Sequence, residues 1–103
     1  MSIVLSYDFS DASEAAPAAA ALAALFKQPL LLAHIVDPTL RGLVPQWETN
    51  LDSAIQRRLE EVADGLGAAH PGLQVKAVQL EGEPAETLNG FAAREQAELL
   101  ILA

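Results

Sequence analysis

The sequence predicts an α/β fold built around a parallel β-sheet. Strand-like and helix-like segments alternate along the whole chain, which is the order that produces β-α-β units. The strand-like segments 3–5, 30–36 and 99–102 are almost continuously apolar, as is typical of strands that helices cover on both faces. Because the crossovers in such units are right-handed, we expect the strands to run parallel.

The composition fits one globular domain over residues 1–103. Hydrophobic residues make up 51% of the chain and charged residues 19%, so we expect a packed core rather than disorder. The chain has no cysteine, which rules out disulfides and thiolate metal sites and is compatible with the cytoplasmic location that we expect. Its start lacks the pattern of a signal peptide, and its apolar runs are shorter than the ~20 residues that span a bilayer.

The charge balance bears on the class of partner. Six basic residues stand against fourteen acidic ones, and the formal net charge is −8. Nucleic-acid surfaces need clustered Lys and Arg, so we expect no nucleic-acid partner. The same charge disfavours anionic membranes, and we expect no membrane partner.

The segment from Ser2 to Ser13 organises the chain as strand, sharp turn and helix start. It places Asp8 directly after the first strand, and ligands of open α/β sheets bind at the carboxyl ends of the strands. Asp8 is therefore either a ligand contact or a cap that orders the turn, since Asp is a preferred capping residue. Asp11 and Glu14 have the spacing of a capping box.

The middle of the chain predicts two helices around a second strand. The alanine-rich segment 12–26 is expected to be a helix with Leu22, Leu25 and Phe26 as its bulky face, and Pro17 predicts a kink or a late start. Segment 30–36 is the second strand, in which we expect His34 to be buried and hydrogen-bonded. Residues 39–48 are irregular and offer Leu43 and Trp47 as cover for the sheet or a partner.

The second half of the chain continues the alternation. Residues from about 49 to 69 predict a helix, with an apolar face formed by Leu51, Ile55, Leu59, Val62 and Leu66. Segment 73–80 alternates apolar and polar residues, which predicts an edge strand. Pro84 suits the first turn of a helix over residues 85–96, with Leu88, Phe91 and Ala92 facing inward. Residues 98–103 close the chain as a strongly apolar strand.

Catalytic and metal-binding constellations are not evident. Ser6, Ser10 and Ser13 have no obvious base and orienting partner, so the sequence indicates no nucleophile. His34 and His70 are not accompanied by ligands at metal-binding spacing. We therefore expect no catalytic residues, no metal site and a binding module rather than an enzyme.

Four segments together resemble the universal stress protein family. They are the opening IVLSYDFSDASEAA, LLLAHIVDP at the second strand, VQLEGEPAETL before the third helix and AELLILA at the end. The resemblance spans nearly the whole chain. It implies a flavodoxin-like three-layer sandwich, of the kind also called adenine nucleotide α-hydrolase-like, with a mostly parallel sheet of order 3-2-1-4-5.

The resemblance also implies a ligand and a partner. Many members bind ATP or AMP at the carboxyl edge of strands 1, 2 and 4, and many form homodimers. The positions that match the family's site are Ser6, Tyr7, Asp8, Ile35 and Ala103. Asp8 would contact the adenosine part, and Ile35 would line the adenine pocket.

The sequence departs from the family's pattern at its end. Nucleotide-binding members continue past strand 4 with a glycine-rich phosphate loop and a fifth strand, neither of which has a counterpart before Ala103. We therefore expect a domain that is incomplete at its C-terminus, with segment 99–102 as an open edge. A truncated protein, a natural fragment or a covering partner chain would each account for it.

Two other functions remain as alternatives. A protein-interaction domain of the same fold, acting through dimerisation without nucleotide, is favoured by the missing glycines. Another nucleotide-binding α/β enzyme would need a phosphate loop after the first strand. Residues 7–11 contain no glycine and two acids, which would repel a phosphate.

Overall fold

The computed structural model describes residues 1–8, 15–36 and 48–102, with side chains from residue 53 onward in the last range. Its elements follow in the order β1 (Ser2–Ser6), α1 (Ala15–Phe26), β2 (Leu30–Val36), α3 (Glu48–Ala69), β3 (Val75–Glu81), α4 (Pro84–Arg94) and β4 (Ala97–Leu102). The four strands form one parallel sheet of order β3-β2-β1-β4. The predicted α/β class and the predicted strand order are confirmed.

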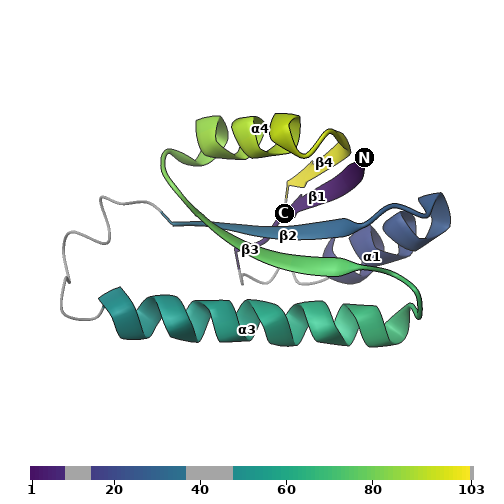
Figure 1. Ribbon diagram of the computed structural model, residues 1–103, viewed down its shortest axis with the longest axis horizontal. Helices are drawn as coiled ribbons and strands as arrows, with labels where there is room; N and C mark the ends of the chain where they lie inside the picture. The colour runs from purple at the N-terminus through teal and green to yellow at the C-terminus, as the bar shows by residue number, and fades with distance from the viewer. Residues whose placement is uncertain (9–14, 37–47, 103) are drawn as a thin grey trace.

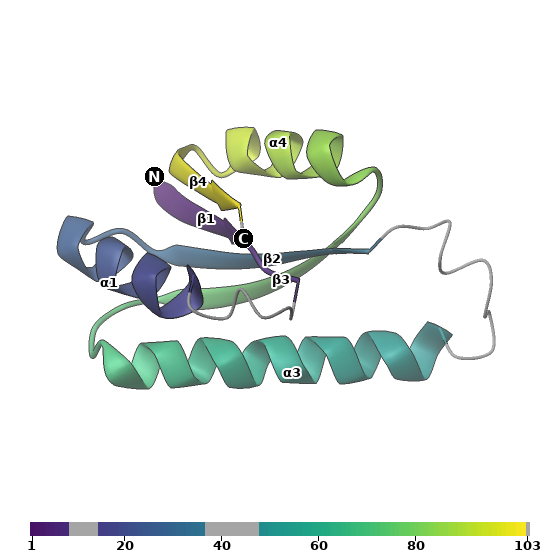
Figure 2. The same ribbon diagram turned by 180° about the vertical axis from the view of Figure 1, so that it is seen from behind.

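The sheet is the middle of three layers (Figure 1). Helices α1 and α3 cover one face of the sheet and α4 covers the other, and the view from behind shows the same division (Figure 2). The proposed capping box at Asp11 and Glu14 and the loop with Leu43 and Trp47 lie outside the described residues. Within residues 1–8, 15–36 and 48–102, no helix is both long enough and apolar enough to cross a bilayer.

Two hydrophobic clusters fill the spaces between the layers. On the α1 and α3 face, Ile3, Leu5, Leu30 and Leu32 of the sheet pack against α1 alanines and Leu59 of α3. On the α4 face, Val4, Leu31 and Ala33 pack against Leu88 and Phe91. Alternate residues of β1 and β2 thus enter opposite clusters, as the pleat requires, so both strands are buried on both faces.

Helix α1 packs through its small residues. Ala16, Ala19, Ala20 and Ala23 are buried, whereas Leu25 is 73% exposed and Phe26 is 56% exposed. The prediction of Leu25 and Phe26 as the packing face was therefore wrong, because the alanine stripe lets the helix lie close to the sheet and turns these two side chains outward. The late start was confirmed, since the helix begins at Ala15 and Pro17 falls in its first turn.

Strand β4 lies at an edge of the described sheet, as expected for segment 99–102 from the family's strand order. Its pairing with β1 leaves it at the edge of the described sheet, where Leu99 is 40% and Leu102 is 71% exposed. The apolar run therefore marks an edge strand in the described part of the chain, not a strand covered on all sides. The buried Ser2 hydroxyl donates a hydrogen bond of 3.1 Å to the backbone oxygen of Glu95 and ties β1 to the end of α4.

Strand β3 forms the opposite edge, as its alternating sequence predicts. Helix α3 lies beneath it and buries Leu59, Ala63 and Leu66, while Leu51 is outside the described side chains. The inward positions predicted for Leu88 and Phe91 of α4 are confirmed.

Candidate functional site

The carboxyl ends of the strands meet at one edge of the sheet. Ser6 ends β1 and is paired with Ala33 of β2 and Leu102 of β4. Tyr7 and Asp8 follow Ser6 at this edge, and Ile35 lies near the end of β2. Four of the five expected site residues are thus at the same edge, whereas Ala103 lies outside the described residues.

Both backbone groups of Tyr7 are held by β2. Its N–H donates a hydrogen bond of 2.8 Å to the oxygen of Ala33, which extends the β1–β2 ladder by one position. Its oxygen accepts a hydrogen bond of 2.8 Å from Nδ1 of His34. The chain is therefore fixed immediately before Asp8, at the end of the sheet where Ile35 also lies.

The side chains at this edge serve different faces. Tyr7 packs against the cluster beneath α1 and α3, and Ile35 packs against the cluster beneath α4. Ser6 and Ile35 are half-buried, and Asp8 is exposed. The edge thus carries an exposed carboxylate and a partly covered apolar side chain, which suits a ligand with both polar and flat apolar parts.

His34 is a site residue whose role the sequence did not reveal. Because a carbonyl oxygen only accepts, Nδ1 of His34 carries the proton in the bond to Tyr7. The histidine is half-buried rather than buried, and its predicted hydrogen bond is present. Its position directly before Ile35 was the available signal, because a polar residue in an apolar strand usually has a specific partner.

A row of polar side chains runs from this edge onto α3. His34 is paired in register with Gln79 of β3. The amide of Gln79 donates a hydrogen bond of 3.3 Å to Gln56, which in turn donates one of 3.1 Å to Glu60. These bonds couple the position of α3 to the carboxyl half of β3.

The loop after β3 reaches the same edge and is ordered as a helix start. The N–H of Gly82 donates a hydrogen bond of 3.1 Å to the oxygen of Val36. The carboxylate of Glu83 accepts bonds from the N–H groups of Ala85 and Glu86, at 3.3 and 2.6 Å, and so caps α4. Pro84 occupies the first turn, as its position in the sequence predicts.

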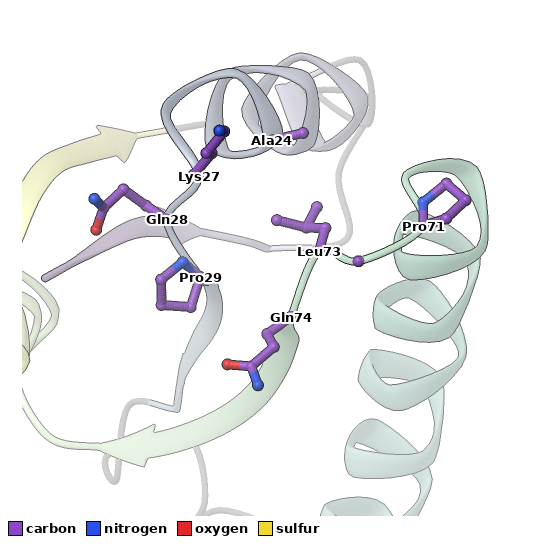
Figure 3. Close-up of a pocket in the computed structure, with 8 residues that line it drawn as sticks. Ala24, Lys27, Gln28, Pro29, Pro71, Leu73 and Gln74 are labelled. Carbon is purple, nitrogen blue, oxygen red and sulfur yellow. The ribbon is translucent and has the colours of Figure 1, made fainter.

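A pronounced hollow lies at the other end of the sheet. It has a volume of about 530 Å³ and is lined by Lys27, Pro29, Pro71 and Gln74, among others. Figure 3 shows Leu73 between the end of α1 and the turn after α3. These residues precede β2 and β3, so this hollow is separate from the edge that carries Asp8.

Among the described residues, no group of three or more His, Cys, Asp or Glu could hold a metal ion.

The family follows from a comparison of the whole chain. The sequence profile of the universal stress protein family matches residues 1–103. The chain belongs to the universal stress protein family. No curated protein matches its sequence.

Solved structures of this family share the fold. One is a universal stress protein in complex with cAMP, at 24% identity and a TM-score of 0.72 over 97% of this chain and 69% of that chain. A family protein from Burkholderia pseudomallei is 26% identical, with a TM-score of 0.68 over 99% and 80%. A universal stress protein from Archaeoglobus fulgidus is 20% identical, with a TM-score of 0.76 over 99% and 74%. These similarities support the three-layer fold and the strand order described above.

Proposed function

We propose that this chain is a regulatory module that binds an adenine nucleotide, ATP or AMP, at the carboxyl edge of β1, β2 and β4. The observation that carries the proposal is the double attachment of Tyr7 to β2, at 2.8 Å on both backbone groups. It fixes the backbone next to Asp8 before any ligand arrives. A site that is already ordered loses less entropy on binding than a loose one.

The chemistry of the edge suits the adenosine part of a nucleotide. The carboxylate of Asp8 accepts hydrogen bonds, and both the ribose hydroxyls and the adenine amino group donate them. Ile35 offers an apolar surface to the base. Phosphates would be repelled by Asp8, so the proposed orientation directs them away from it.

Similarity to the family supports the proposal. A structural relative at 24% identity was crystallised in complex with cAMP, which also contains adenosine and a phosphate. The positions of Ser6, Tyr7, Asp8 and Ile35 at one edge are compatible with such a ligand. We include Ala103 in the proposed site on the family resemblance alone.

We propose binding rather than turnover as the activity. Among the described residues at this edge, Nδ1 of His34 is hydrogen-bonded to the backbone oxygen of Tyr7 and not to a serine hydroxyl. A nucleophile with its base and orienting group is the arrangement that fast hydrolysis would need. A cytoplasmic location, where ATP and AMP are both present, belongs to the same proposal.

A second candidate function is a protein-interaction module that acts through dimerisation. It is favoured by β4, the edge strand of the described sheet on which Leu99 and Leu102 are 40% and 71% exposed. An exposed apolar edge strand readily pairs with another chain. In this function the homodimer would form without nucleotide.

Isothermal titration calorimetry separates the two functions. The chain is titrated with ATP, with AMP and with GTP as a control for the base. Saturable micromolar binding of ATP or AMP, with weaker binding of GTP, supports the nucleotide module. Absence of binding together with dimerisation in analytical ultracentrifugation would support the interaction module instead.

A further inference from the structure

We propose that the outer edge of β3 accepts an extended, basic segment of a partner protein as an additional strand. This site lies on a different part of the sheet from the candidate nucleotide site. It does not depend on whether a nucleotide binds.

The register of β3 determines which of its backbone groups point outward. The N–H of Leu30 donates to the oxygen of Gln74 at 2.9 Å, and the oxygen of Val36 accepts from the N–H of Gly82 at 3.1 Å. In a parallel pair, every second residue directs both backbone groups to the neighbouring strand. The N–H and C=O groups of Lys76 therefore point toward β2. The same groups of Val75 and Ala77, the residues on either side, point away from β2.

Those outward groups are held in place by buried neighbours. The side chains of Val75 and Ala77 pack against the cluster beneath α1 and α3. In the described sheet, β3 is the end strand and has β2 on one side only. An incoming strand would thus find an anchored backbone with donors and acceptors at the spacing of a β-ladder.

A groove accompanies this part of the edge. It has a volume of about 740 Å³ and lies between α3 and α4, with Val78 and Phe91 among its apolar lining residues. Its α3 side is made by Ala63 and Gly67, and a Cβ added at Gly67 would meet only the oxygen of Leu73, at 3.9 Å. The small residues leave room for the side chains of an added strand.

The charged residues that line the groove favour a basic segment as its occupant. Asp64 of α3 and Glu95 after α4 place carboxylates in its lining, and Lys76 supplies one ammonium group. A lysine on an edge strand normally deters pairing with other chains. Here two carboxylates outnumber it, and the whole chain has a net charge of −8, so a segment with alternating small apolar and basic residues complements the groove.

The test uses the whole chain and a short blocked peptide that alternates valine and lysine. Fluorescence anisotropy measures binding of the labelled peptide, and amide hydrogen exchange locates it. We expect saturable binding that slows exchange at Val75 and Ala77, whereas Lys76 and Val78 are already protected by β2. A peptide that alternates valine and glutamate should bind at least about tenfold more weakly.

Two kinds of variant make the test specific. Ala77→Pro removes one outward N–H without removing a bond to β2, so binding should weaken about five- to tenfold while the fold persists. Ala77→Ser keeps the N–H and should bind as the parent does. If Ala77→Pro fails to fold, the double variant Asp64→Lys with Glu95→Lys serves instead, and it should abolish the preference for the basic peptide.

Three results would overturn the proposal. They are equal binding of the acidic and basic peptides, slowed exchange that avoids Val75 and Ala77, and self-association through β3 that the peptide does not disrupt. The last would make a second copy of this chain the occupant.

Discussion

The imidazole Nδ1 of His34 donates a hydrogen bond of 2.8 Å to the backbone oxygen of Tyr7, 27 residues earlier in the chain. This bond joins the ends of the two central strands directly beneath the candidate site. His34, a polar residue in an apolar strand, therefore has a structural role. Its bond to Tyr7 fixes the backbone directly before Asp8.

Replacing His34 tests this bond through stability. His34→Phe removes the donor and leaves the half-buried oxygen of Tyr7 without it, so the free energy of unfolding should fall by about 1 to 3 kcal/mol. His34→Asn places an amide nitrogen near the position of Nδ1 and should recover part of the loss. Urea denaturation followed by circular dichroism measures both variants. Equal loss in the two variants would show that ring packing, and not the hydrogen bond, is what matters.

Replacing Asp8 tests the nucleotide site. Asp8→Ala removes the carboxylate expected to accept hydrogen bonds from adenosine, and the affinity for ATP should fall by roughly ten- to a hundredfold. Asp64→Ala is the matched control, because it removes an exposed carboxylate of α3 that lines the groove beside β3. Calorimetry compares the two variants with the parent. Equal affinities in all three proteins would remove Asp8 from the site.

The turn before α4 predicts a steric effect at Gly82. Its φ of 149° disfavours other residues, and an added Cβ would collide with the hydroxyl of Thr87. Gly82→Ala should therefore lower the free energy of unfolding by about 1 to 3 kcal/mol. Adding Thr87→Ala should relieve the collision and leave only the backbone strain.

A glycine in an open position provides the control for Gly82. A Cβ added at Gly65 of α3 would meet no atom within 4 Å beyond its chain neighbours and the backbone of its own helix. Gly65→Ala should raise the free energy of unfolding by about 0.5 to 1 kcal/mol, because alanine is the better helix former. If Gly82→Ala were as benign as Gly65→Ala in thermal unfolding, the geometry of this turn would be wrong.

The cap of α4 predicts a smaller loss. The carboxylate of Glu83 accepts two bonds from the first N–H groups of the helix. Glu83→Ala should lower the free energy of unfolding by about 0.5 to 2 kcal/mol. Glu83→Asp, which keeps a carboxylate on a side chain preferred at this position, should retain most of the stability. Thermal denaturation of both variants measures these changes in stability. A Glu83→Ala variant as stable as the parent would contradict the capping role.

The sequence predicted which strands are central and which lie at an edge, because the pattern of apolar residues in a strand reflects its burial. Strand β2 is apolar from Leu30 to Ala33 and lies in the middle of the sheet, and the alternation from Val75 to Leu80 marks an edge. The resemblance to the family supplied the order itself. Periodicity alone does not say which strands are neighbours, since several orders satisfy the same pattern.

Packing partners were less accessible to the sequence. The bulky residues Leu25 and Phe26 suggested one packing face for α1. The helix instead packs through its alanines, because a close approach of helix and sheet buries Ile3 and Leu5 more completely. Strand β4 is as apolar as β2, and its position at an edge of the described sheet was expected from the family's strand order and not from its composition. Composition reports the preference of a segment for burial, whereas its position depends on the segments around it.

The candidate site was predictable in its position and not in its bonds. The rule that ligands meet the carboxyl ends of parallel strands led to Asp8 without coordinates. The bond from His34 to Tyr7 depends on a register between residues 27 positions apart, which the sequence does not show. The outward groups of Val75 and Ala77 follow from register in the same way.

We propose that an adenine nucleotide binds where Asp8 and Ile35 lie at the ends of β1 and β2. Titration of the isotope-labelled chain with ATP, followed through backbone amide chemical shifts, tests it most directly. Saturable shifts are expected at Asp8 and Ile35, with the amides of Lys27 and Gln74 at the opposite end unchanged. Shifts confined to Lys27 and Gln74, or none at saturating ATP, would contradict it.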